Sequence, residues 1–237
     1  MALTVGFHPV REALLARRPL DKVLIAKGAA GPRFQEIIDL CRTHGVPVRF
    51  EPRELLDRTS KGVSHQGVIA FGVPQPYADL AEVTEGANLL VILDGVEDPH
   101  NLGAIIRTAH AAGASAVVIS ERRAAPLTET VARAAAGALE YTPVVRVTNI
   151  SQTLERLKKK GFWIYGLDER GAELYDHVDY ASPTALVLGG EGKGLHQGVQ
   201  KHCDILVRIP MARAVPSLNV SVATGVVLFE WRRRQNA

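Results

Sequence analysis

Three short segments, far apart in the chain, carry glycine and polar residues where an apolar run ends. They span residues 94–107, residues 188–194, and residues 209–211 continuing into 216–221. In an open α/β sheet, ligands bind at strand ends of this kind. The few polar side chains of these segments form the candidate catalytic set: Asn101, Arg107, Glu191, Ser217 and Asn219. This composition is typical of an active site.

The second segment, Leu-Gly-Gly-Glu-Gly-Lys-Gly, has four glycines within six residues. It fails the Walker A spacing because glycine follows Lys193, and it fails the dinucleotide fingerprint because Leu195 occupies the position of its last glycine. Glycines allow positive φ and a close approach of backbone to a ligand. A tight turn between a strand and a short helix is the alternative. The number of glycines favours a loop whose backbone groups bind a small polar ligand.

Several of these residues also have a structural alternative. Asn101 and Ser217 could each be a helix N-cap, which is worth about 1 kcal/mol. Arg107 lies in an apolar context, where an arginine usually has a charged partner, either a carboxylate such as Glu191 or a ligand phosphate. Gly225, within the last predicted helix, costs about 1 kcal/mol relative to alanine. A close helix contact, such as one across a subunit interface, would explain that glycine.

The pattern of apolar residues predicts the scaffold that positions these segments. In the first unit it predicts helices at 9–16, 34–44 and 53–57, and strands at 23–26, 46–50 and 67–71. Gly45 is expected to end the second of these helices. Residues 74–77, Pro-Gln-Pro-Tyr, are typical of a stiff linker. We therefore expect an α/β domain at 1–72, a linker at 73–84 and a second domain at 85–237.

The second unit begins with an apolar strand at 89–93, as expected in a buried parallel sheet. Further strands are predicted at 115–120, 143–147, 162–167, 184–189 and 204–209. Helices are predicted at 102–112, 127–138, 150–160, 195–201 and 217–234. This alternation predicts an α/β fold with a mostly parallel sheet that helices cover on both faces.

Composition narrows the class of protein further. The 237 residues carry a net charge of +3, and residues 1–72 hold 11 Lys and Arg against 7 Asp and Glu. A basic first unit is compatible with a polyanion partner, although an ordinary solvated surface would look the same. No apolar run approaches the ~20 residues of a membrane helix, and no secretory signal is evident. Cys41 and Cys203 have no spacing that indicates a disulfide or zinc site. We expect a cytoplasmic protein that binds neither metal nor membrane.

The three segments resemble motifs 1, 2 and 3 of the SpoU (TrmH-like) branch of the SPOUT methyltransferase superfamily. The similarity lies in Asn-Leu-Gly-Ala-Ile-Ile-Arg-Thr-Ala at 101–109, Leu-Gly-Gly-Glu-Gly-Lys-Gly-Leu at 188–195, and Ile-Pro-Met with Ser-Leu-Asn-Val-Ser-Val-Ala at 209–211 and 217–223. Residues 6–14 and 65–68 resemble the N-terminal domain of RlmB-type 23S rRNA guanosine-2′-O-methyltransferases. That substrate-binding domain is of the ribosomal-protein L30e-like kind.

This resemblance implies several features of the fold and the site. The SPOUT catalytic domain has a deep C-terminal trefoil knot, binds S-adenosyl-L-methionine in a bent form, and forms homodimers with the site near the subunit interface. The RNA partner is most simply 23S rRNA, and DNA is excluded because the reaction needs a ribose 2′-hydroxyl. The catalytic set of the family matches the five residues above. Its cofactor contacts match five others: Gly189, Gly190, Ile209, Met211 and Leu218.

The implied reaction transfers a methyl group from a sulfonium to a guanosine 2′-hydroxyl, without a metal. The resemblance gives Arg107 the role of deprotonating that hydroxyl with help from the substrate phosphate. Arginine keeps its proton in nearly all protein settings, so a charged Arg107 could instead hold the phosphate and stabilise the developing alkoxide. Asn101 and Glu191 are expected to orient Arg107, and Ser217 and Asn219 to shape the site.

Three other functions fit parts of this pattern. Sister enzymes methylate a tRNA guanosine or, in antibiotic resistance, an rRNA adenosine. The amino-acid sequence at residues 6–14 and 65–68 disfavours both. A non-catalytic RNA-binding or ribosome-assembly protein would be expected to lose Arg107, Glu191 or Asn219, and all three are present.

Arg213 and Pro216 depart from the small or polar residues expected at these positions of the third segment, and they could alter the lip of the cofactor pocket.

Overall fold

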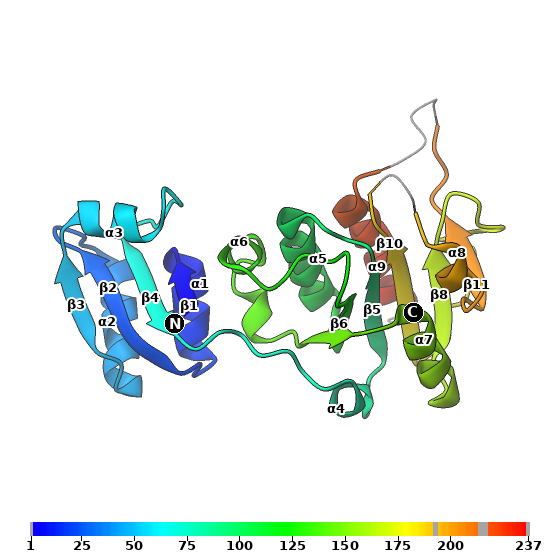
Figure 1. Ribbon diagram of the computed structural model, residues 1–237, viewed down its shortest axis with the longest axis horizontal. Helices are drawn as coiled ribbons and strands as arrows, with labels where there is room; N and C mark the ends of the chain where they lie inside the picture. Colours follow the sequence, from blue (N-terminus) through cyan, green and yellow to red (C-terminus); the bar gives the residue numbers. More distant parts are fainter. Residues whose placement is uncertain (1, 192–193, 213–217, 236–237) are drawn as a thin grey trace.

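The computed structural model describes residues 2–191, 194–212 and 218–235. Figure 1 shows two α/β units side by side, the N-terminal one in blue and cyan and the C-terminal one in green to red. Each unit is built around its own sheet, of four strands in the first and seven in the second. No helix in the described ranges is long and apolar enough to cross a membrane.

The N-terminal unit contains a mixed sheet with helices on both faces. Its strands are β1 (Ala2–Val5), β2 (Leu20–Ala26), β3 (Val48–Glu51) and β4 (Val68–Gly72), in the order β1-β4-β2-β3. Its helices are α1 (Phe7–Leu15), α2 (Pro32–His44) and α3 (Arg53–Thr59). Gly45 ends α2 in the left-handed conformation, as predicted. Strand β1 was not predicted, because four residues without a clear pattern become a strand only by pairing with β4.

Apolar side chains on both faces of this sheet form the core of the unit. On one face, Val10 of α1 and Ile37 of α2 pack against Val23 and Ile25. On the other face, Leu56 of α3 packs among Leu24, Ile69 and their neighbours. The chain therefore buries a complete small core before it reaches residue 73.

The described strands of the C-terminal unit form a fully parallel sheet, where the sequence predicted a mostly parallel one. Its strands are β5 (Leu89–Asp94), β6 (Ala116–Ser120), β7 (Val144–Val147), β8 (Trp163–Leu167), β9 (Glu173–Leu174), β10 (Thr184–Gly189) and β11 (Ile205–Arg208), in the order β7-β6-β5-β10-β8-β11-β9. All six neighbouring pairs are parallel. Strands β5 and β10, which carry two of the three motif segments, are therefore adjacent and end at the same edge.

Helices cover both faces of this sheet. They are α4 (Leu80–Thr84), α5 (Pro99–Ala112), α6 (Glu129–Ala134), the 3-10 helix η1 (Ala138–Glu140), α7 (Ile150–Lys159), α8 (Gln197–Gln200) and α9 (Val220–Gln235). Helices α5, α6 and α9 pack on one face, and α7 and α8 on the other. The helix predicted at 127–138 is interrupted, because Ala136 and Gly137 both have positive φ. The expected linker also contains a short helix, α4, which the sequence analysis did not predict.

The N-terminal unit contacts η1 and Tyr141, the residue after it, through polar side chains. Arg18 donates a hydrogen bond to Glu140 at 2.8 Å, and both side chains are less than a tenth exposed. Burial raises the pKa of Glu140, and the charge of Arg18 opposes that effect. The Tyr141 hydroxyl donates to Glu12 at 2.8 Å. The two units therefore meet on the β6–β7 side of the large sheet, away from β8 and β11 (Figure 1).

Candidate active site

One buried amide joins the three motif segments. The Asn101 Oδ1 atom accepts a hydrogen bond from Asn219 Nδ2 at 3.0 Å, and its Nδ2 donates to the Glu191 carboxylate. Asn101 is 8% exposed, so its amide depends on these partners rather than on water. One side chain from each of the three motif segments, Asn101, Glu191 and Asn219, thus meets the others at this point.

The start of α5 explains why Asn101 is available for this role. Asp98 is the N-cap, and its Oδ1 accepts a hydrogen bond from the His100 N–H at 2.8 Å. Pro99 occupies the first turn, where its missing N–H costs nothing. Asn101 is therefore not the N-cap that the sequence left open as an alternative. Its side chain is free to bond across the site.

Asn219 bonds to Asn101 and also begins α9. Its Oδ1 accepts hydrogen bonds from the Ser221 N–H at 2.9 Å and the Ser221 hydroxyl at 2.6 Å. Its Nδ2 is left to reach Asn101. Ser217, which the sequence offered as the N-cap of the last helix, lies outside the described residues, as do Arg213 and Pro216.

Arg107 stands apart from this cluster. It is exposed on α5, and six residues of a helix with 3.6 residues per turn carry it about 120° around the axis from Asn101. Within the described residues, the bonded partner of Glu191 is Asn101 rather than Arg107. Asn101 and Glu191 were expected to orient Arg107, but among the described residues neither contacts it directly. The helix begins at Pro99, and this start turns Arg107 toward solvent.

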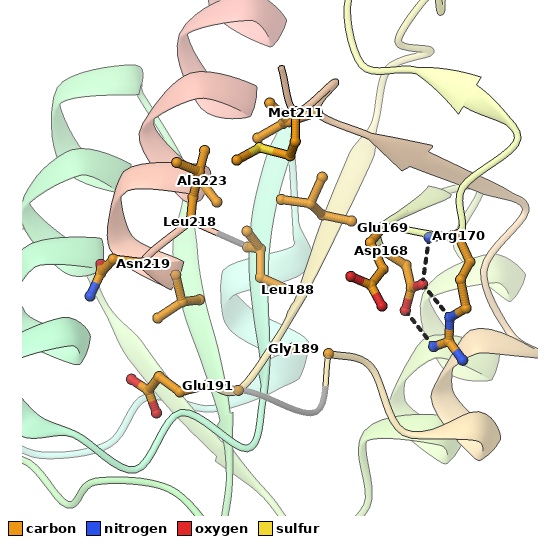
Figure 2. Close-up of a pocket in the computed structure, with 15 residues that line it drawn as sticks. Asp168, Glu169, Arg170, Leu188, Gly189, Glu191, Met211, Leu218, Asn219 and Ala223 are labelled. Carbon is orange, nitrogen blue, oxygen red and sulfur yellow. Dashed lines mark hydrogen bonds and ion pairs between the residues drawn. The ribbon is translucent and has the colours of Figure 1, made fainter. Parts of the chain in front are cut away.

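A cavity of about 600 Å³ opens beside the cluster. It is lined by all five residues expected to contact the cofactor: Gly189, Gly190, Ile209, Met211 and Leu218. Glu191 and Asn219 of the catalytic set also line it, as Figure 2 shows. The structure therefore places seven of the predicted site residues around one cavity, with Asn101 directly behind two of them.

The lining of this cavity combines apolar side chains with charged side chains and glycine backbone. Leu188, Ile209 and Leu218 supply apolar contacts, and Met211 closes the side away from Glu191 (Figure 2). The volume lies in the range of ordinary small-molecule sites. A bound S-adenosylmethionine offers an adenine ring, a ribose and a methionine chain, and these surroundings fit such a molecule.

Two glycines of the second segment, Gly189 and Gly190, are required by packing within the chain. A Cβ atom at Gly190 would overlap the carbonyl oxygen of Gly95, and one at Gly189 would overlap the backbone of Gly194. The Gly190 N–H is bonded to the Asp94 carbonyl at 2.9 Å. The sequence analysis expected these glycines to let the backbone approach a ligand. At Gly189 and Gly190 the close approach is between two backbone segments, which fixes the loop that carries Glu191.

One wall of the cavity was not predicted from the sequence. Asp168, Glu169 and Arg170 follow β8 and line the cavity opposite the motif residues (Figure 2). The guanidinium of Arg170 donates to both oxygens of Asp168, at 2.7 and 2.8 Å, and Gln200 donates to Asp168 at 2.9 Å. The Arg170 bond lowers the pKa of Asp168. These residues follow a predicted strand directly, so the strand-end rule could have found them.

Comparison with known proteins decides the family. The model of the SpoU rRNA Methylase family matches residues 88–229, and the model for RNA 2′-O ribose methyltransferase substrate binding matches residues 3–78. The chain belongs to the SpoU rRNA methylase family. It is therefore an RNA 2′-O-methyltransferase that uses S-adenosyl-L-methionine as methyl donor. The similarity of the three segments to SpoU motifs is confirmed, as is the α/β fold with its N-terminal substrate-binding unit.

Individual relatives of this SpoU methylase match along nearly the whole chain. It is 42% identical over 238 residues to YacO of Bacillus subtilis (strain 168), named as a TrmH family tRNA/rRNA methyltransferase, covering 98% of the chain and 95% of that protein. It is 44% identical to the 23S rRNA (guanosine-2′-O-)-methyltransferase RlmB of Pseudomonas aeruginosa, covering 97% and 95%. The crystal structure of the SpoU methyltransferase AviRb from Streptomyces viridochromogenes with AdoMet superposes with a TM-score of 0.84, at 26% identity, covering 99% and 90%.

Proposed function

We propose that this SpoU methylase transfers a methyl group to the 2′-hydroxyl of a guanosine in 23S rRNA, in the P-loop of the peptidyl-transferase centre. The observation that carries the proposal is the amide of Asn101, which ties all three motifs together beside a cofactor-sized cavity. The full-length similarity to a 23S rRNA guanosine methyltransferase supports the choice of RNA. Such a substrate places the enzyme in the cytoplasm. A tRNA guanosine or an rRNA adenosine is the alternative target.

The cavity residues are proposed to hold the methyl donor, which supplies an electrophilic methyl group when it is bound. Ile209, Met211 and Leu218 would contact its apolar parts, and the fixed backbone at Gly189 and Gly190 would limit where it can sit. Because methyl transfer requires alignment of the donor and the acceptor oxygen, a rigid wall contributes directly to rate.

Arg107 is proposed to act as a charged clamp rather than as a base. Its side chain is exposed, and an arginine in water keeps its proton because solvent stabilises the charge. From this position it can bind a phosphate of the RNA and stabilise negative charge that develops on the 2′-oxygen. Glu191, Asn101 and Asn219 would hold the surrounding loops, and Ser217 stays a predicted member of the same set.

The N-terminal unit is proposed to bind the RNA. Residues 1–72, with their excess of basic residues, would select the RNA substrate. Residues 73–84 would form the linker, and residues 85–237 would form the catalytic domain. The contacts of Arg18 and Tyr141 would hold the first unit in a fixed position relative to the second. The trefoil knot stays a prediction, and the insertion of β10 between β5 and β8 is compatible with it.

A second copy of the chain is proposed to cover α9. Val222 and Phe229 are 53% and 51% exposed on this helix, and Met211 and Leu218 are about 40% exposed at the mouth of the cavity. A Cβ atom at Gly225 would have Thr108 Cγ2 as its nearest neighbour in the chain, at 3.7 Å, which is an ordinary contact. Among the residues that the structure describes, the close helix contact expected at Gly225 is therefore absent. A homodimer through this face would supply it and would bring the partner close to the cavity.

The test is methylation of purified RNA with labelled S-adenosylmethionine, using a 23S rRNA transcript, bulk tRNA and the Arg107→Ala variant as control. The proposal predicts one modified guanosine in the 23S transcript, mapped by blocked primer extension and absent with the variant. Labelled tRNA without labelled 23S rRNA would keep the enzyme class and reject the target. Methylation of no RNA would reject the proposed function.

A further inference from the structure

A second cavity, of about 310 Å³, lies at the same edge of the large sheet but on the side of α7 and α8. It is bordered by residues that follow β5, β6 and β7, together with the segment that precedes α8. The residues that matter for its chemistry are Asp94, Ser120, Arg122, Arg123, Ser151 and His196. Neither arginine has a role in the site described above.

Arg123 is held in place by a relay that begins at a buried carboxylate. The Asp94 Oδ2 atom accepts hydrogen bonds from both the backbone N–H and the ring Nδ1 of His196, each at 2.9 Å. The other ring nitrogen, Nε2, lies 3.2 Å from Arg123 Nη1. Since arginine can only donate, Nε2 accepts and the ring proton must be on Nδ1. The Asp94 side chain is 10% exposed and therefore fixed in place. Through His196 it orients the exposed guanidinium of Arg123.

The backbone around the arginines is also constrained. Arg123 has a positive φ of 56°, which is uncommon for a residue with a side chain. The Ser120 hydroxyl donates to the Arg122 carbonyl and holds the turn that carries both arginines. A purely solvated arginine would need neither this turn nor the relay from Asp94.

The charges of this cavity favour an anion. Arg122 and Arg123 contribute two positive charges, and Asp94 contributes one negative charge that its bonds to His196 already satisfy. The Ser151 hydroxyl adds a neutral donor at the wall. Guanidinium groups bind phosphate through paired N–H donors, so two arginines beside a hydroxyl fit a phosphate group.

The second cavity adjoins the proposed reaction centre. Gly95 lines it, and the carbonyl of Gly95 packs directly against Gly190, which lines the cofactor cavity. Glu191 is the next residue along the chain. One layer of backbone therefore separates the two cavities, and an RNA strand with one nucleotide at the reaction centre can reach the second cavity with a neighbouring phosphate.

We propose that this cavity, which we call the Arg122–Arg123 site, binds a backbone phosphate of the RNA next to the target nucleotide. The inference rests on the proposed function and deepens it, because it names a contact that sets the register of the RNA. Phosphate contacts position a nucleic acid without reading its sequence. Loss of the site should therefore weaken RNA binding for every sequence and leave methyl transfer from bound RNA nearly unchanged.

The test compares three proteins: Arg122→Ala/Arg123→Ala, Arg122→Lys/Arg123→Lys, and the control Arg156→Ala, which removes an exposed arginine further along α7. Methylation of the 23S transcript gives kcat and KM, and equilibrium binding of the same transcript at several salt concentrations gives the slope of log K against log salt. For the alanine pair we expect a KM about tenfold higher and a salt slope smaller by about 1. The lysine pair should recover most of the slope, and S-adenosylmethionine affinity should equal that of the control.

Two results would overturn the inference. One is an alanine pair whose KM and salt slope match those of Arg156→Ala. The other is a lysine pair that binds RNA no better than the alanine pair while S-adenosylmethionine binding is intact in both. Because RNA binding is measured without turnover, a protein that methylates no RNA would reject the proposed function, while the comparison of salt slopes would still decide the phosphate site.

Discussion

The two walls of the cofactor cavity are built from different interactions. On the motif side, Glu191, Asn101 and Asn219 form one hydrogen-bonded chain that joins three segments and is largely buried at its centre. On the β8 side, an ion pair between Asp168 and Arg170 joins residues two apart, and the Arg170 side chain is 59% exposed. The chain through Asn101 fixes three segments relative to one another, whereas Asp168 joins its own loop to α8 alone, through Gln200. Changes on the motif side should therefore have much larger effects on catalysis.

The largest effect is expected from Arg107→Ala. Loss of the charge that binds phosphate and stabilises the developing alkoxide should lower kcat about 10²–10³-fold. Because Arg107 does not line the cofactor cavity, S-adenosylmethionine affinity should stay unchanged. Single-turnover methylation and calorimetric titration of the cofactor measure the two quantities.

Arg107→Lys is the matched variant for this residue. If the positive charge is what matters, it should retain more activity than Arg107→Ala. Equal inactivity of the two variants would count against the clamp.

The next largest effect is expected from Asn101→Ala. The change leaves the Glu191 carboxylate and the Asn219 amide without a shared partner, which should lower the free energy of unfolding by about 1–3 kcal/mol. Displacement of the loops by even 1 Å should reduce kcat about 10²-fold. Urea unfolding and single-turnover rates test these values. A variant with normal stability and rate would show that the amide chain does not organise the site.

Gly190→Ala should act on cofactor binding. Its Cβ atom would overlap the Gly95 carbonyl, so the loop between the two cavities must move. We expect S-adenosylmethionine affinity to fall at least about tenfold, as a shift of a cofactor wall implies. Gly198→Ala is the control, because its Cβ atom would meet only the Ser151 hydroxyl at 3.6 Å among the described residues. Equal cofactor affinity in the two variants would contradict the close packing of the loop.

The smallest effect is expected on the β8 side, from Asp168→Asn. Arg170 lowers the pKa of Asp168, so the ionised carboxylate stabilises the folded chain. That stabilisation is present above the unfolded pKa of about 3.9 and is lost as pH falls through the lower folded value. Wild type should therefore be more stable than Asp168→Asn at pH 6, and the difference should shrink by pH 3. Urea unfolding at the two pH values measures it, and a difference independent of pH would rule out the ion pair as its source.

The sequence predicted the long elements better than the short ones. Continuous apolar patterns identified β5 and β10, and Gly45 marked the end of α2. Strand β1 and the two-residue β9 depend on pairing with distant strands. Local sequence carries little signal for such elements.

The same contrast holds for the site. The five expected cofactor residues line one cavity. They could be predicted because each lies in a segment with strong glycine, proline or apolar patterning. Asp168, Glu169 and Arg170 lie in an ordinary polar loop, where only position after a strand marks them. The bond from Asn101 to Glu191 could not be predicted, because it depends on whether α5 begins at Asp98 or at Asn101. A shift of three residues at a helix start changes which side chains face the site.

Alkaline hydrolysis of the labelled product shows whether this site methylates the ribose of a guanosine. Alkali cleaves RNA through the free 2′-hydroxyl, so a 2′-O-methyl group leaves an uncleaved dinucleotide. We expect label from S-adenosylmethionine, transferred to 23S rRNA, to be recovered in one alkali-resistant dinucleotide that contains guanosine. Label in mononucleotides, which would mean base methylation, or in a dinucleotide with a methylated adenosine, would contradict it.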